Sequence, residues 1–216
     1  MLSEDNRYYV CALANAIYMK ADWVNKFEKE GTYKENFTDI NGDESEIDFM
    51  HQAAAFQYYE NGDTKAVKLP YENGLSMVVA LGDTKNILND IHNNKMTSKL
   101  VDVSLPKFKA EYSIDYVNIL KNMGIEKAFD NQNADFSLML ENYPERIKID
   151  SVLQKAMIDV DEKGTEAAAA TVAVLTKSAL SVDEEVIEFR ADKPFTYYIL
   201  DDSGNVYFAG RYVKAE

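Results

Sequence analysis

Apolar residues dominate several stretches of the chain, and their spacing predicts β-strands. Residues 7–20 (RYYVCALANAIYMK) are apolar at nearly every position, which suits a strand covered on both faces, although a buried helix gives the same pattern. Residues 44–51 are strand-like, and residues 100–108 alternate apolar and polar side chains. Further strands are predicted within residues 54–82, 146–164 and 186–213, with turns at Asn61-Gly62-Asp63, Asn73-Gly74 and Ser203-Gly204.

Two short segments favour helices instead. Thr84 is placed to cap residues 85–94, in which apolar side chains recur on one face. Ser113 is placed to cap residues 114–123, and Gly124 is placed to end that helix. The inward faces are predicted to be Ile87, Leu88 and Ile91 in the first helix and Val117, Leu120 and Met123 in the second.

These elements predict one α+β domain, residues 1–216, that is rich in strands and poor in helices. With 46% hydrophobic residues, the chain has enough apolar material for a core. Fully apolar strands need cover on two faces, however, and two short helices cannot cover a wide sheet. We therefore expect the chain, taken alone, to expose apolar sheet surface and to associate.

The charge of the chain argues against some classes of partner. Its 37 acidic and 23 basic residues give a net charge of −14 at pH 7, with no local block of Lys or Arg. Such a charge repels phosphate backbones and anionic lipids, so neither nucleic acid nor membrane is expected as a partner. These residues also contain no signal pattern. The lone Cys11 is expected to be a buried free thiol, which leaves the compartment open.

Residues suited to catalysis or metal binding are sparse. The two histidines, His51 and His92, have no Cys, Asp or Glu at metal-ligand spacing, so both are expected to be solvated surface residues. The chain has no Gly-x-Ser-x-Gly motif of the kind that supports a serine nucleophile. We therefore expect no metal, no cofactor and no enzymatic activity.

One stretch, residues 164–176 (GTEAAAATVAVLT), is nearly free of charge and of large side chains. Taken alone it favours a helix that starts at Thr165. As a strand it would place only Thr and Ala on one face, at every second residue from Thr165 to Ala173. A segment this narrow could enter a sheet between two existing strands without a steric clash.

Four longer stretches carry a family resemblance. Residues 15–27 (NAIYMKADWVNKF), 103–112 (VSLPKFKAEY), 152–171 (VLQKAMIDVDEKGTEAAAAT) and 189–213 resemble the serpin family of protease inhibitors. The resemblance implies the serpin fold, with large mixed and antiparallel sheets. It covers the later, C-terminal part of that fold, so its N-terminal helical part would be absent from this chain. A complementary N-terminal serpin chain is then one expected partner.

The resemblance implies suicide inhibition by a reactive-centre loop at about residues 162–186. A serine protease would cleave the loop, which would then enter the main sheet between residues 7–18 and 146–161 as a new strand. Pairing about ten residues on both edges would contribute on the order of 10 to 20 kcal/mol, at about 0.5 to 1.5 kcal/mol per hydrogen bond. The intact form would therefore be metastable.

The usual loop length in the family implies a position for the reactive bond. Counted from Gly164, that position is the bond between Ser178 and Ala179, which suits an elastase-like protease. The loop is slightly long on its far side, so Lys177, Leu175 or Leu180 are alternatives. Lys177 would suit a trypsin-like target.

The family motifs imply roles for further residues. Trp23 would pack where the loop enters the sheet, while Asn15 and Gln154 would belong to the polar cluster that lets the sheet part. The family usually has His where Gln154 stands, so a pH response of this cluster is not expected. Glu162 and Lys107 would pair at the loop base. The hinge would consist of Gly164, Thr165, Glu166, Ala167, Ala168, Ala169, Ala170 and Thr171.

Other interpretations stay open. A non-inhibitory serpin with a chaperone, carrier or storage role is one, although the small hinge residues argue against it. An inactive truncated copy is another. The resemblance suggests an extracellular location, and a cytoplasmic one is the alternative.

Overall fold

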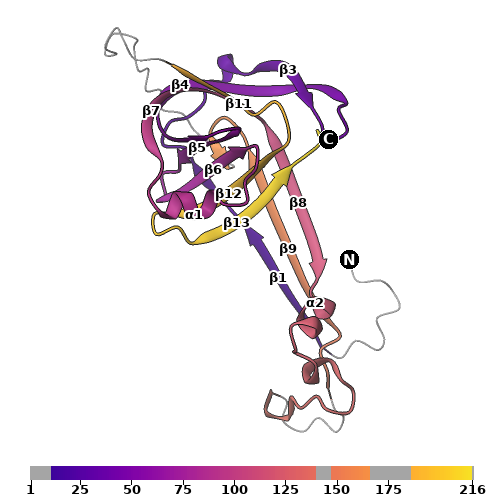
Figure 1. Cartoon of the computed structure of the whole chain (residues 1–216). Helices are drawn as coiled ribbons and strands as arrows, with labels where there is room; N and C mark the ends of the chain where they lie inside the picture. Colours follow the sequence, from indigo (N-terminus) through magenta and orange to yellow (C-terminus); the bar gives the residue numbers. More distant parts are fainter. Residues whose placement is uncertain (1–10, 140–146, 166–185, 216) are drawn as a thin grey trace. The chain divides into compact units, whose positions relative to one another are not determined.

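The computed structural model describes residues 11–139, 147–165 and 186–215. The chain divides into two compact units, one of residues 1–19 and 110–158 and the other of residues 20–109 and 159–216 (Figure 1). Each unit therefore combines segments that are far apart in the sequence. The division crosses two strands, β8 (Phe108–Asp115) and β9 (Ser151–Val160).

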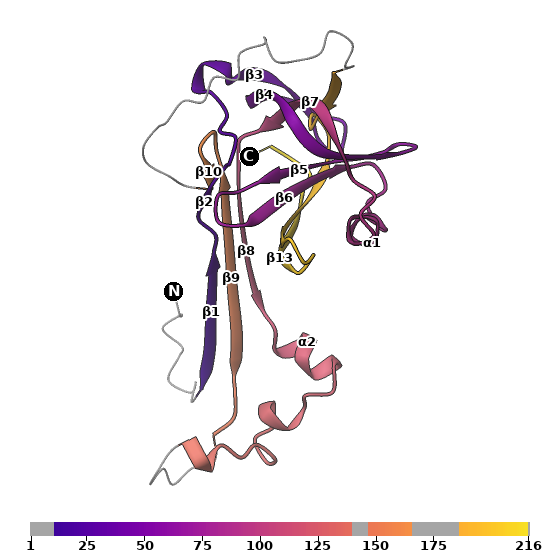
Figure 2. The same cartoon turned by 90° about the vertical axis from the view of Figure 1, so that its left-hand side faces the viewer.

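The first unit contains a three-stranded sheet in the order β1-β9-β8 (Figure 2). Strand β1 (Ala12–Tyr18) runs parallel to β9 over seven residue pairs. The connection from β8 to β9 contains α2 (Val117–Asn122) and two single-turn helices, η3 (Lys127–Phe129) and η4 (Ser137–Met139). The predicted strand character of β1 and β9 is therefore confirmed.

The expected exposure of apolar sheet surface is confirmed in this unit. In β1, Leu13 is 46% exposed and Tyr18 is 43% exposed. The cover on both faces that the apolar run predicts is thus missing from the described residues. The predicted inward face of α2 is confirmed only in part: Val117 and Leu120 are half-buried, but no residue of α2 is fully buried and Met123, just after it, is exposed.

The second unit contains one large mixed sheet. Its strand order is β11-β7-β4-β5-β6-β12-β13, with β3 paired to β4. Only β11 and β7 run parallel among these pairs, and the other neighbours are antiparallel. The strands are β3 (Tyr33–Thr38), β4 (Glu44–Asn61), β5 (Thr64–Pro70), β6 (Leu75–Leu81), β7 (Thr97–Pro106), β11 (Ile187–Arg190), β12 (Phe195–Asp201) and β13 (Val206–Tyr212).

Glycine turns join several of these strands, as the sequence predicts. Gly62 joins β4 to β5, Gly74 joins β5 to β6, and Gly204 joins β12 to β13; all three have positive φ angles, of 60°, 82° and 84°. Side chains with less than 2% exposure fill the core, including Phe37, Phe49, Met77, Leu105 and Phe195. The smaller elements of this unit are β2 (Ala21–Asp22), η2 (Lys29–Gly31), α1 (Ile87–His92) and β10 (Gly164–Thr165).

The predicted helix caps are wrong at both helices. The N-cap of α1 is Asn86, while the hydroxyl of Thr84 bonds to the hydroxyl of Thr196 at 3.1 Å. Ser113 lies inside β8, and α2 begins later because Asp115 Oδ1 accepts a hydrogen bond from the amide of Val117 at 3.0 Å.

Among the described residues, no helix is long and apolar enough to cross a membrane.

Candidate functional site

Trp23 is the centre of a buried aromatic stack in the second unit. Its side chain is 1% exposed and lies parallel to the ring of Tyr71, with ring centroids 4.1 Å apart. Phe27 meets Trp23 edge to face at 6.1 Å. Offset stacking and edge-to-face contact are the favoured geometries of aromatic pairs, so this cluster holds the indole in one orientation.

The stacked indole holds the turn at residues 161–164. Trp23 Nε1 donates to the carbonyl of Asp161 at 2.9 Å, and its backbone amide donates to the carbonyl of Lys163 at 2.8 Å. The turn is also closed from within, because Asp161 Oδ1 accepts the amides of Lys163 and Gly164. A buried tryptophan therefore fixes the backbone at which residues 166–185 begin.

Gly164 occupies a position that no other residue fits without a shift. Its φ is +147°, and a Cβ atom there would lie 2.1 Å from the carbonyl oxygen of Ala21. The close approach arises because β10 pairs antiparallel with β2, with Gly164 opposite Asp22 and Thr165 opposite Ala21. The first two residues of the predicted hinge are thus already paired as a strand.

An ion pair fastens the same turn to the end of β7. Lys107 Nζ lies 3.0 Å from Glu162 Oε1, and these are the two residues that the resemblance pairs. The Glu162 side chain is only 7% exposed, whereas that of Lys107 is 37% exposed. Burial raises the pKa of Glu162, but hydrogen bonds from the backbone and from Lys107 outweigh it, so the pKa lies below the usual 4.5.

We expect Lys107→Met to destabilise the second unit by about 1 to 3 kcal/mol at pH 7, because it leaves a buried carboxylate without its cation. A carboxyl with a lowered pKa contributes stability at neutral pH and loses it as the pH falls through that pKa. Thermal melting of wild type and variant should therefore converge below about pH 4. Lys99→Met, at an exposed residue of β7, is the control. A gap that stays constant between pH 7 and pH 3 would contradict this role.

Asn15 and Gln154 are brought together in the first unit. They are direct partners in the parallel pairing of β1 with β9. The resemblance implies that the loop enters between these two strands, and the structure shows that the strands are hydrogen-bonded neighbours. Entry would therefore first have to separate them.

Some of the remaining predicted residues lie outside the described residues, and for the others the structure gives the exposure. Glu166 to Thr171 of the hinge and the reactive-bond candidates Leu175, Lys177, Ser178, Ala179 and Leu180 lie outside the described residues. His92 is exposed as predicted, but the prediction for His51 is wrong, because its side chain is 16% exposed and stacks on Tyr33. Cys11 is half-buried.

Sequence reasoning missed Tyr71 and Phe27 as parts of the site. Tyr71 meets Trp23 only because the turn between β5 and β6 brings it there, and the two form a bridge between segments 48 residues apart. No local pattern in one sequence reports such a contact.

Among the described residues, no group of three His, Cys, Asp or Glu side chains is placed to hold a metal ion.

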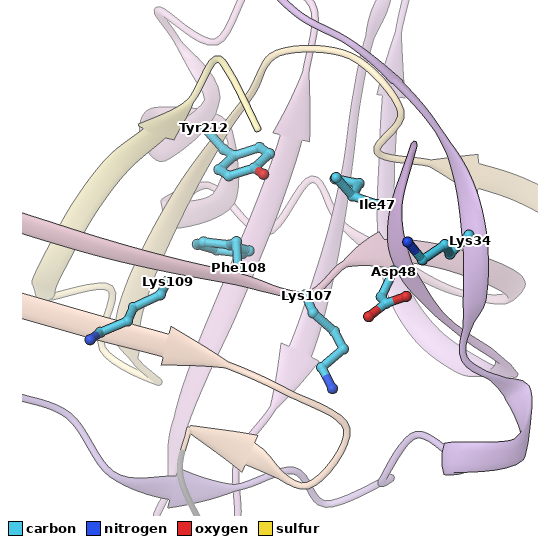
Figure 3. A pocket seen from close by; sticks show the side chains of 7 residues that line it. All are labelled: Lys34, Ile47, Asp48, Lys107, Phe108, Lys109 and Tyr212. Atoms are coloured by element: carbon cyan, nitrogen blue, oxygen red, sulfur yellow. The ribbon is translucent and has the colours of Figure 1, made fainter. Parts of the chain in front are cut away.

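A cleft of about 330 Å³ lies beside the ion pair (Figure 3). Phe108, Tyr212 and Ile47 give it an apolar wall, and Lys34, Asp48, Lys107 and Lys109 line the rest. In Figure 3 the Lys107 ammonium group points away from the rings of Phe108 and Tyr212. The cleft therefore shares Lys107 with the turn that the ion pair fastens.

Comparisons with known proteins agree over almost the whole chain. The family model described as Serpin (serine protease inhibitor) matches residues 2–215. An uncharacterized serpin-like protein of Thermococcus kodakarensis is 37% identical over 92% of this chain and 48% of its own length. Serpin B11 of Mus musculus is 32% identical over 95% of this chain and 56% of its own length.

A solved structure gives the same picture. The native state of the thermophilic serpin tengpin superposes with a TM-score of 0.81 at 29% identity, covering 99% of this chain and 58% of that chain. This chain thus spans about half the length of the curated relatives that it matches. The strand-rich fold with few helices that the sequence predicts is confirmed by this likeness.

Proposed function

The chain belongs to the serpin family, and we propose that it carries the loop-bearing part of a serine protease inhibitor that acts by loop insertion. The protease serine Oγ would attack the carbonyl carbon of Ser178, and the Ser178–Ala179 amide bond would break. Ala179 would leave with a proton as a new N-terminus, and an ester would link the protease to Ser178. An elastase-like or trypsin-like protease is the proposed partner.

The observation that best supports this proposal is the register of the paired hinge. Gly164 lies opposite Asp22 on one side and forms a bridge to Asp161 on the other. In an antiparallel ladder, each residue further along the loop moves both partners back by one residue. Seven residues after Gly164, Thr171 would lie opposite both Asn15 and Gln154, which are already partners of each other.

The same register predicts which face of the loop turns inward. Thr165 lies opposite Ala21, and continuing the bridge places it opposite Val160. Both partners are buried, with exposures of 7% and 1%, and directly opposed residues share a face of the sheet. Ala167, Ala169 and Thr171 follow at two-residue steps on that face, where small side chains fit.

The pairing of β1 with β9 lowers the energy gain expected for insertion. Entry would break the ladder of seven residue pairs between β1 and β9 and would form two new ladders, one between the loop and each strand. The net gain in hydrogen bonds is therefore about one ladder. That amounts to about 4 to 10 kcal/mol, at about 0.5 to 1.5 kcal/mol per hydrogen bond. The gain is still comparable with the stability of a whole domain, about 5 to 15 kcal/mol, so a metastable intact form remains our proposal.

A gel assay tests the proposal. The chain is incubated with pancreatic elastase or trypsin, both alone and mixed with the part of the Thermococcus kodakarensis relative that its alignment leaves uncovered. We expect a complex of chain and protease that survives boiling in detergent, because an ester joins the two. Cleavage between residues 175 and 180 with no such complex in either mixture would contradict inhibition. It would favour a non-inhibitory serpin.

A further inference from the structure

Strand β1 forms one edge of the three-stranded sheet in the first unit (Figure 2). It pairs with β9 on one side, and no strand among the described residues pairs with its other side. The N–H and C=O groups of such an open edge can pair with a strand of another chain. Two of its side chains, Leu13 and Tyr18, are also 46% and 43% exposed. Strand β1 therefore offers both backbone groups and apolar side chains to a partner.

The other open edges of the two large sheets carry charges, and the edge of β1 does not. Charged side chains on an edge strand are a common protection against pairing with another chain. Among the described strands of four or more residues with a single neighbour, β3, β8, β11 and β13 contain between one and three charged residues each. Strand β1 (ALANAIY) contains none, in a chain whose net charge is −14. Its edge thus lacks this protection against association.

The sequence of β1 fits a second copy of itself in antiparallel register. A two-fold axis through Asn15, the central residue, pairs all seven residues of the strand with the same strand of the other copy. Leu13 of each copy then lies opposite Ile17 of the other. Ala12 of each copy lies opposite Tyr18 in the same way. Directly opposite residues share a face of the sheet, so each large side chain packs against an apolar one.

We propose that two copies of this chain associate edge to edge through β1 and join their three-stranded sheets into one six-stranded sheet. A second copy brings an edge that is itself uncharged, so the contact buries no charge. The pairing with β9 stays intact, because it uses the other side of β1. The two acidic chains repel each other elsewhere, so association depends on backbone hydrogen bonds and apolar contact. This assembly does not rest on protease inhibition.

Sedimentation velocity of the intact chain tests the dimer. We expect a reversible equilibrium between a species of 24.5 kDa and one of about twice that mass, shifting toward the dimer as the concentration rises. Added salt should tighten the dimer, because it screens the repulsion between the two acidic chains. A monomer at every concentration, a dimer that weakens with salt, or growth into larger species would overturn the proposal.

Substitutions at Asn15 test the register, because the two-fold axis places this residue opposite itself. Asn15→Lys and Asn15→Glu each put two like charges face to face, so each variant alone should show a dimer dissociation constant at least about tenfold higher. A mixture of the two should form a heterodimer, since Lys then faces Glu. Tyr112→Lys, at a 57% exposed residue of the edge strand β8, is the matched control and should stay dimeric. Dimeric Asn15→Lys, or a monomeric mixture of two folded variants, would show that the proposal is wrong.

Hydrogen exchange of the unmodified chain covers the case in which the Asn15 variants fail to fold. Amides on the outer side of β1 gain hydrogen-bond partners in the dimer and exchange more slowly. We expect the protection of residues 12–18 to increase with chain concentration, while that of residues 108–115 in β8 stays constant. Protection of residues 12–18 that does not depend on concentration would contradict pairing through this edge.

Discussion

Under the proposed inhibition, Thr171→Arg is expected to turn the chain from an inhibitor into a substrate of its protease. In the proposed register Thr171 enters between Asn15 and Gln154, on the face of the sheet that buries Ala21 and Val160. Neither Asn15 nor Gln154 offers a guanidinium a negative charge, and burying an unpaired charge costs several kcal/mol. Entry should slow by at least about a hundredfold, so that the ester hydrolyses first. The yield of detergent-stable complex measures this.

Ala170→Arg is the matched control. Residue 170 lies one step earlier and therefore points to the opposite face of the inserted strand. We expect this variant to keep most of the complex formed by the wild type. Equal loss of complex in both variants would mean that the loop enters in another register or does not enter. Equal retention would mean that residue 171 is never buried.

Trp23→Ala is expected to destabilise the second unit by about 3 to 5 kcal/mol, which is the usual cost of removing a buried tryptophan. The change removes the stack on Tyr71 and the hydrogen bond to the carbonyl of Asp161 together. The turn at residues 161–164 should therefore loosen as well. Urea unfolding measures the first effect, and hydrogen exchange of the Gly164 amide measures the second.

Trp23→Phe separates the two contributions. Phenylalanine keeps an aromatic ring against Tyr71 but has no Nε1 donor, so the carbonyl of Asp161 loses that partner. We expect a smaller loss of stability, about 1 to 3 kcal/mol, with clear loosening of the turn. If Trp23→Ala left the exchange of Gly164 unchanged, the indole would not be what holds the turn.

Much of the fold could be predicted from local pattern. The apolar run of β1, the alternation in β7 and the glycine turns at Gly62 and Gly74 each indicate their structure within a few residues. The helix caps could not be predicted, because Thr84 bonds to Thr196, which lies 112 residues away. Nor does an apolar run report whether the element that covers it is present, as the exposed side chains of β1 show.

Some residues of the candidate site could likewise be predicted from the sequence, and others could not. Trp23, Glu162 and Lys107 could be identified because family motifs surround them, and the structure brings all three to one turn. Tyr71 and the burial of His51 depend on contacts across the sheet, which a single sequence does not encode locally. The pairing of Asn15 with Gln154 is a register, and register follows from the whole sheet.

Thermal melting of the chain before and after a single cut between residues 175 and 180 tests whether the severed loop becomes a strand of the sheet. A severed loop that becomes a strand between β1 and β9 adds about one ladder of hydrogen bonds. We expect the nicked chain, its two pieces still associated, to melt at least about 10 °C higher than the intact chain. A nicked chain that melts at the same temperature or lower would contradict it.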